Sequence, residues 1–221
     1  HLTLEGERLF PSIQKAVAGY QAMLEIANEI KGLASGTIRI GTISSISCHW
    51  LPGLIKQFQE IYPNVRFVLH QGDYTSIPEW VRTGEADFGF VNPDAIPGVK
   101  TTFIKTGELR AVLPADHALA KAPYITLENL AEEPFLLLEE GALSEPLEAF
   151  KKAGLEPSVR LCVHDDYSIL SMIESGLGVS ILPELVLRKT GYEVAILPLK
   201  PVLTRKIGLV IKDKNSLPVA S

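Results

Sequence analysis

The chain has no excess of basic residues. It carries 21 Lys and Arg against 26 Asp and Glu, a formal net charge of −5 at pH 7. Surfaces that hold nucleic acid are usually basic, because they neutralise phosphates. This charge balance therefore argues against direct nucleic-acid binding by these residues. A length of 221 residues allows one large domain or two smaller lobes.

Long apolar runs are also missing. No run in the sequence approaches the roughly 20 residues that a bilayer-spanning helix needs. The residues before number 30 carry charges throughout and lack the continuous apolar segment of a secretion signal. We therefore expect a cytoplasmic protein with no membrane partner.

Cysteine is scarce. Cys48 and Cys162 are the only two, they lie far apart, and they form no C-x-x-C or zinc-binding spacing. Apolar residues stand within two positions of each: Ile46 and Trp50 around Cys48, and Leu161 and Val163 around Cys162. We therefore predict two buried free thiols in a reducing compartment.

Catalytic and metal-binding motifs are lacking as well. His1, His49 and His70 are scattered without the spacing of a metal site, and no P-loop or G-x-S-x-G is present. The Gly-Leu-Gly at 176–178 follows a predicted helix, whereas a dinucleotide-binding loop follows a strand. Adjacent residues on a strand point to opposite faces, so the run at 164–166 is no sign of an acid–base pair. We expect no catalytic residue, no metal and no cofactor.

The stretch from Gly36 to Pro63 predicts a strand, a turn and a helix. The strand covers 37–43 and is rich in β-branched residues, and the serine-rich turn covers 44–47. Apolar residues then recur at helical spacing. Free backbone N–H groups at such a helix start favour an anionic or carbonyl-bearing ligand.

A long helix is predicted before this stretch. From Phe10 to Ala34 its apolar positions alternate in steps of three and four, which is typical of a coiled-coil seam. Thr3 is the expected N-cap, and Pro11 is tolerated only near the first turn. Packing of the helix on its own body is the alternative to pairing with another subunit. The seam residues chosen as the dimerisation surface are Ile13, Val17, Tyr20, Leu24, Ala27 and Ile30.

Strands and helices continue to alternate along the rest of the chain. This alternation predicts an α/β fold with parallel strands, arranged as two lobes with a ligand cleft between them. Five turns at strand ends are rich in Ser, Thr, Asn and Gly, which suits a small polar ligand. Ordinary helix capping by Ser44, Thr75 and Ser144 is the alternative explanation for three of them. The predicted strands are 65–70, 87–91, 106–113, 135–138, 158–163, 179–182, 194–197 and 206–211, and the helices 77–82, 127–131, 145–153, 167–175 and 184–189.

Several segments together resemble LysR-type transcriptional regulators. They are LTLEGERLFP, SGTIRIG followed by LP and YP, GEADFGF, LPADHALA and MIESGLGVSILPE, in the family's order. The resemblance implies a linker helix (1–35) and an effector-binding domain of the periplasmic-binding-protein type 2 fold. That domain would have two Rossmann-like lobes joined by crossover strands, lobe I at 36–107 and 213–221 and lobe II at 108–212. The family's winged helix-turn-helix would precede His1, and a last helix of lobe I would start near the end of the chain, so a fragment is expected.

The resemblance also implies where an effector is held. Strand 87–91 has no arginine, which some carboxylate-binding members place there. Helix N-termini can hold an anion without one. The implied contacts are Ser44, Ser45, Ile46, Tyr74, Thr75, Val91, Asn92, Ala142, Leu143 and Ser144, with His164 and Ser168 in addition.

The expected function is effector sensing and oligomerisation without chemistry. The implied partners are a small metabolite, such as an organic or amino acid, and further copies in a homodimer or homotetramer. DNA would be bound only through the winged helix-turn-helix of the parent protein. A solute-binding protein of an uptake system is the main alternative, and an enzyme on the same fold is the second.

Overall fold

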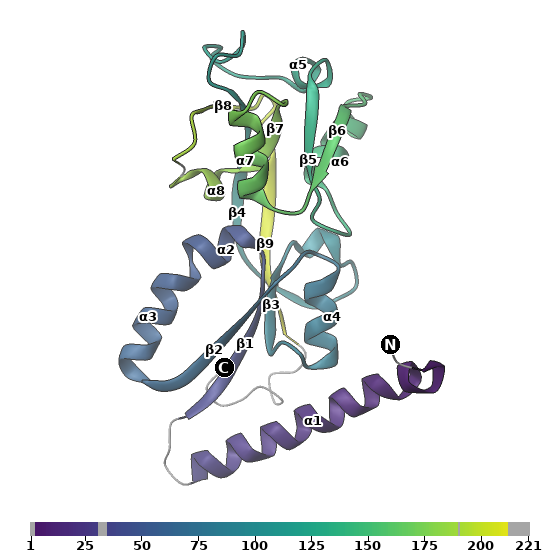
Figure 1. The fold of residues 1–221 in the computed structure, drawn as a ribbon, viewed down its shortest axis with the longest axis vertical. Helices are drawn as coiled ribbons and strands as arrows, with labels where there is room; N and C mark the ends of the chain where they lie inside the picture. Colours follow the sequence, from purple (N-terminus) through teal and green to yellow (C-terminus); the bar gives the residue numbers. More distant parts are fainter. Residues whose placement is uncertain (1–2, 31–34, 190, 212–221) are drawn as a thin grey trace. The chain divides into compact units, whose positions relative to one another are not determined.

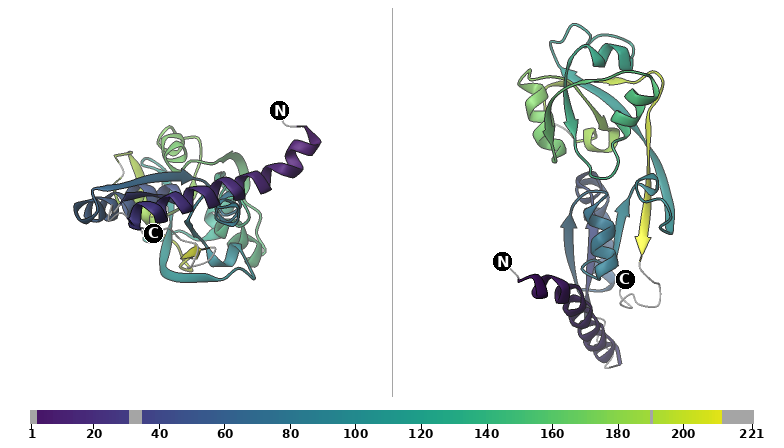
Figure 2. Two further views of the ribbon diagram at one scale, coloured as in Figure 1. Left: turned by 90° about the horizontal axis from the view of Figure 1, so that it is seen from below. Right: turned by 90° about the vertical axis from the view of Figure 1, so that its right-hand side faces the viewer.

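The computed structural model describes residues 3–30, 35–189 and 191–211, and it divides into two compact units (Figures 1 and 2). Unit 1 comprises residues 1–103 and 208–221, and unit 2 comprises 104–207. The chain passes from unit 1 to unit 2 within strand β4 (Thr101–Pro114) and returns within β9 (Thr204–Ile211). The tail predicted to belong to lobe I, 213–221, lies outside the described residues.

The predicted N-terminal helix is present as α1 (Leu4–Ile30). The Oγ1 atom of Thr3 accepts a hydrogen bond from the Gly6 N–H at 3.1 Å, which confirms Thr3 as the cap. Ile13, Val17 and Tyr20 are each more than half exposed on this helix when only the described residues are considered. The side chains of Leu24, Ala27 and Ile30 lie outside the described part of the chain.

Unit 1 is built on parallel strands, as the sequence predicts. β1 (Ser35–Thr42) pairs with β2 (Asn64–Gln71) on one side and with β3 (Phe88–Val91) on the other. The returning β9 pairs antiparallel with β3. The helices of this unit are α2 (Ser44–His49), α3 (Leu51–Ile61), α4 (Ser76–Thr83) and the short 3-10 helix η1 (Pro93–Ala95), with α4 beside β3 in Figure 1.

Two glycines allow α4 to approach this sheet closely. Gly41 and Gly89 are partners in the β1–β3 register, and both face Ile77 of α4. A Cβ atom on Gly89 would lie 2.3 Å from the Cγ2 of Ile77, and one on Gly41 would lie 2.9 Å from it. Ile77 of α4 therefore packs against the backbone of β1 and β3 at the two positions that have no side chain.

Unit 2 departs from the predicted parallel arrangement. β4 pairs antiparallel with both β7 (Ser180–Pro183) and β8 (Val194–Pro198), whereas β5 (Pro134–Leu138) and β6 (Ser158–Val163) are parallel. The parallel pairing predicted from strand–helix repeats therefore holds for β5 and β6 but not for the neighbours of β4, because helical connections also occur between strands that are not sheet neighbours. The helices are α5 (Leu127–Ala131), α6 (Glu145–Lys152), α7 (Asp166–Glu174) and α8 (Glu184–Leu187).

Local sequence signals define the helix ends in unit 2. Thr126 and Asn129 form a capping box at the start of α5. Helix α6 has two acidic residues in its first turn and two lysines in its last, which suits the helix dipole. These ends match the predicted ranges within about two residues, which is the usual uncertainty of helix boundaries.

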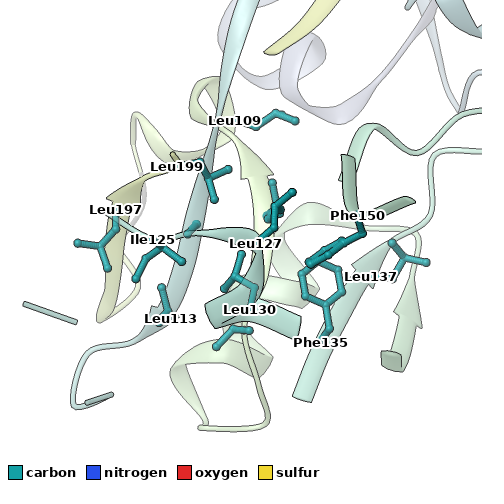
Figure 3. Close-up of a cluster of buried hydrophobic side chains, with 13 residues drawn as sticks. Leu109, Leu113, Ile125, Leu127, Leu130, Phe135, Leu137, Phe150, Leu197 and Leu199 are labelled. Carbon is teal, nitrogen blue, oxygen red and sulfur yellow. The ribbon is translucent and has the colours of Figure 1, made fainter. Parts of the chain in front are cut away.

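A buried apolar cluster joins α5 and α6 to β4, β5, β7 and β8 (Figure 3). The rings of Phe135 and Phe150 meet edge to face, with centroids 5.4 Å apart and an interplanar angle of 84°. A second cluster joins α7 and α8 to β5 and β7. The first cluster consists of Leu109, Ala111, Leu113, Ile125, Leu127, Leu130, Phe135, Leu137, Phe150, Val179, Ile181, Leu197 and Leu199.

The prediction of two buried thiols was wrong. Cys48 and Cys162 are both free and exposed. Cys48 lies near the end of α2, whose buried residues are at its start, and Cys162 lies on β6, most of which is exposed. Apolar sequence neighbours do not bury a residue at such positions. Among the described residues, no helix is long and apolar enough to cross a membrane.

Candidate functional site

The carboxyl ends of β1, β2 and β3 meet at one edge of the unit 1 sheet. Thr42, the last residue of β1, is the register partner of Gln71, the last residue of β2. The Gly72 N–H then donates to the Thr42 carbonyl oxygen at 3.0 Å. Because β3 runs parallel to β1, its carboxyl end with Asn92 reaches the same edge. Ligands of open α/β sheets bind at such edges.

Polar side chains are buried at this edge. Thr42, Ser45 and Asn92 are each at most 1% exposed, and Ser44 is 9% exposed. The Oγ1 of Thr42 donates to the Ile43 carbonyl oxygen at 3.1 Å, and the Oδ1 of Asn92 accepts from the Asp94 N–H at 3.0 Å. Burial of polar groups costs free energy unless hydrogen bonds compensate. The clustering of four buried polar side chains at this edge therefore makes it the candidate ligand site of unit 1.

The predicted serine-rich turn is instead the first turn of α2. Ile43 occupies the N-cap position and has no side-chain cap bond, and Ser44 and Ser45 are already helical. The Oγ of Ser47 donates to carbonyl oxygens of its own helix turn, at 3.0 Å to Ser44. Capping by Ser44, the alternative explanation from the sequence, is therefore not what the structure shows.

The turn from β2 to α4 is organised by Asp73, which is not among the predicted contact residues. Its Oδ1 accepts from the Thr75 N–H at 2.8 Å, the Ser76 N–H at 2.7 Å and the Ser76 Oγ at 2.8 Å. Asp73 thereby accepts hydrogen bonds from free N–H groups at the start of α4. Thr75, which was expected to cap this helix, makes no side-chain cap bond and is exposed. Tyr74, between them, is almost completely buried. An Asp three residues before a helix start is the sequence signal that could have identified this role.

A second polar edge lies in unit 2, at the carboxyl ends of the parallel strands β5 and β6. The Glu139 N–H donates to the Val163 carbonyl oxygen at 2.9 Å, so the 139–144 turn starts beside His164. The imidazole of His164 is 75% exposed, and its Nε2 lies 3.9 Å from a carboxylate oxygen of Glu139. Ala142 is exposed and Leu143 is half-buried.

Two predicted contact residues at this second edge take part in helix capping. The Oγ of Ser144 accepts from the Leu147 N–H at 3.3 Å at the start of α6. Asp165 caps α7, and its Oδ2 accepts from both the N–H and the Oγ of Ser168 at 2.8 Å. Ser144 is therefore the N-cap of α6, as the alternative explanation from the sequence expected. That Ser144 and Ser168 contact an effector stays a prediction.

A buried ion pair that was not predicted also reaches this turn. The Nη1 of Arg205 on β9 donates to the Oε1 of Glu140 at 3.1 Å, and the Arg205 side chain is only 2% exposed. No local sequence pattern links two residues 65 positions apart.

Two carboxylates at helix surfaces have lowered pKa values. The hydrogen bond from Arg82 lowers the pKa of Glu79 on α4, and the hydrogen bond from Thr126 lowers the pKa of Glu128 on α5. Among the described residues, no group of three or more His, Cys, Asp or Glu could hold a metal ion.

The structure thus places the predicted contacts in two groups. Ser44, Ser45, Ile46, Tyr74, Thr75, Val91 and Asn92 lie at the unit 1 edge, and Ala142, Leu143, Ser144, His164 and Ser168 lie at the unit 2 edge. That the two groups face one shared cleft stays a prediction.

Comparisons with known proteins identify the family. Residues 31–220 match the LysR substrate binding domain. The chain is 33% identical over 186 residues to the HTH-type transcriptional regulator YvbU of Bacillus subtilis, covering 83% of this chain and 63% of that protein. It is 29% identical over 220 residues to the transcriptional dual regulator GltC of the same organism, covering 97% and 73%.

A solved structure agrees with this match. The effector binding domain of QuiR in complex with shikimate superposes with a TM-score of 0.74 at 22% identity, covering 84% of this chain and 91% of that one. The fold is therefore the mixed α/β fold of LysR effector-binding domains, with α1 before it. The family consists of transcription regulators and has no enzymatic activity, which separates the chain from the uptake protein and the enzyme considered above. The chain belongs to the LysR-type transcriptional regulators and contains their substrate binding domain.

Proposed function

We propose that this chain is the effector-sensing and oligomerising region of its parent regulator. It binds a small polar metabolite and thereby controls DNA binding by a separate domain of the parent protein, in the cytoplasm. The observation that carries the proposal is the set of buried polar side chains at the carboxyl ends of β1 and β3 in unit 1.

The chemistry of this edge suits hydrogen bonding to a small polar ligand. Ser44, Ser45 and Asn92 offer hydroxyl and amide groups, and the apolar Ile46 and Val91 beside them are buried. Hydrogen bonds are stronger in such an apolar, low-dielectric environment, and they fix the orientation of the ligand. β3 carries no arginine, so an organic acid would rely on backbone N–H groups and hydroxyls. The QuiR domain, which was solved with shikimate, is a relative with a ligand of this kind.

The exposed apolar side chains of unit 1 support the oligomerisation part of the proposal. Ile13 on α1 is 54% exposed, and Ile61 on α3 is 71% exposed. Further exposed apolar side chains on α1 are Leu4, Leu9, Phe10, Val17, Tyr20 and Met23. Exposed apolar side chains gathered on one helix favour association with another protein surface. We propose a homodimer or homotetramer with α1 helices paired along the Ile13–Ile30 seam. A ligand that prefers one quaternary arrangement then shifts the population towards it.

A thermal-shift screen against organic and amino acids tests the effector proposal. A metabolite at about 100 times its Kd adds roughly 2.7 kcal/mol to the stability, a shift of several degrees. Ser45→Ala and Ala142→Trp should each abolish the shift caused by a hit. Ser47→Ala is the matched control in α2, because Ser47 bonds its own helix turn, and Ala118→Trp is the control for bulk at an exposed site of unit 2. A hit unaffected by both test variants, or no hit with either this chain or the full-length parent, would contradict the proposal.

A further inference from the structure

Arg205 occupies an inward-facing position of a strand. Along β9, Arg205 and Ile207 are buried, whereas Thr204 and Lys206 are exposed. An apolar residue is the usual occupant of such a position. Arginine remains protonated at every pH that a protein experiences. A buried guanidinium is therefore costly unless an anionic partner with good geometry compensates it.

Glu140 supplies that partner. The Arg205 Nη1 to Glu140 Oε1 distance is 3.1 Å, and the Glu140 side chain is 14% exposed. Charge-assisted hydrogen bonds of this kind are among the stronger ones in proteins. Glu140 lies in the turn between β5 and α6, so the pair ties this turn to β9.

The two ends of the 139–144 turn are held by other groups. The Glu139 N–H donates to β6 at one end, and Ser144 caps α6 at the other. Between them the backbone turns through Gly141, whose φ is +82°. The ion pair therefore fixes the turn immediately before this reversal, and Ala142 and Leu143 follow it.

We propose that the Arg205–Glu140 ion pair positions the 139–144 turn for effector binding. This inference rests on the proposed function for its purpose, because Ala142, Leu143 and Ser144 are the predicted contacts in that turn. Arg205 is a positioning residue: it acts through Glu140. A turn that is already ordered loses less conformational entropy when a ligand binds.

Hydrogen–deuterium exchange of the ligand-free chain tests the positioning directly. Glu140→Gln keeps the shape of the side chain but removes its charge. We expect amide exchange at the end of the turn to rise about ten- to hundredfold, the loss expected for a hydrogen bond to a charged group. The reporters are the N–H groups of Leu147 and Glu148, which donate to Ser144 at 3.3 and 3.0 Å. The Leu136 N–H, which donates to the Val179 carbonyl oxygen at 2.8 Å in the core, should keep its wild-type rate.

Two further variants separate positioning from general stabilisation. Glu139→Gln removes the same charge from the neighbouring, 50% exposed side chain and should change exchange in the turn by less than about threefold. Arg205→Lys keeps a cation at the buried position. It should therefore retain more of the wild-type protection of the turn against exchange than Arg205→Met does. A rise in exchange throughout unit 2, unfolding of the Glu140→Gln variant, or no rise in the turn would overturn the proposal.

This experiment needs no ligand, so its outcome is independent of the metabolite screen. If no metabolite shifts the melting temperature but Glu140→Gln raises exchange only in the turn, the effector function is contradicted and the positioning is not. A hit whose affinity is unchanged in Glu140→Gln would leave the effector function standing and overturn the positioning.

Discussion

Replacement of Gly89 by alanine tests how α4 is seated on the unit 1 sheet. The new Cβ would lie 2.3 Å from the Cγ2 of Ile77, which is fully buried, and 3.4 Å from both a Val81 methyl group and the Gly41 carbonyl oxygen. Carbon atoms in contact normally lie about 3.5–4.0 Å apart, so the strand or the helix must move. Overpacking of this kind costs about 1–3 kcal/mol.

Urea denaturation followed by tryptophan fluorescence measures this cost. Trp50 and Trp80, the only tryptophans, both lie in unit 1. A loss of about 2 kcal/mol at an m-value of about 2 kcal/mol/M lowers the midpoint by about 1 M. Gly53→Ala is the matched control, because a Cβ there has nothing within 4 Å. That variant should be neutral or more stable by about 0.4–1 kcal/mol.

A double-mutant cycle identifies Ile77 as the obstacle. Ile77→Ala alone should cost about 2–5 kcal/mol. In the double variant with Gly89→Ala the clash is relieved, so the double variant should be more stable than the sum of the two losses predicts. Two results would refute the reasoning. One is a Gly89→Ala stability within about 0.5 kcal/mol of wild type, which is the ordinary scatter of surface substitutions. The other is a double variant whose loss equals the sum of the two single losses.

Three other predictions follow from exposed groups. Ile13→Asp places a charge in the proposed α1 seam and should shift sedimentation towards the monomer; an unchanged oligomer would contradict the seam. Cys48 and Cys162 should both react with a thiol reagent in the native chain, since both are exposed, and reaction only after unfolding would contradict this. The hydrogen bond from Arg82 lowers the folded-state pKa of Glu79. Its stabilisation is therefore present at neutral pH and lost as the pH falls through that pKa, so the stability difference between wild type and Glu79→Gln should disappear in acid.

The sequence predicted most elements because their signals are local. Helical spacing in α1, capping residues at α5 and α6, and β-branched strands such as β1 each act within a few residues. The break between α2 and α3 also had a local signal: Pro52 stands in the first turn of α3, where proline favours a helix start.

Contacts between distant segments could not be predicted in the same way. The antiparallel pairing of β4 with β7 and β8 depends on topology, which alternating strands and helices leave open. Cys162 shows the same limit, because a β6 sequence with apolar residues does not reveal that most of the strand is exposed. The partner of Arg205 lies 65 residues away, so its burial was invisible in the sequence.

The candidate site was predicted in part. The strand ends that carry Ser45 and Asn92 follow from parallel βα units. Thr42 was missed because it was read as an ordinary strand residue, and Asp73 because capping was assigned to Thr75. In both cases the missed residue lies one or two positions before the expected turn.

A crystal structure of the chain with a metabolite selected by the thermal-shift screen tests the central claim most directly. We expect ligand polar atoms within about 3.2 Å of Ser45 or the first N–H groups of α2, and close to Asn92. A ligand bound away from the carboxyl ends of β1 and β3, for example only along α1, would contradict it.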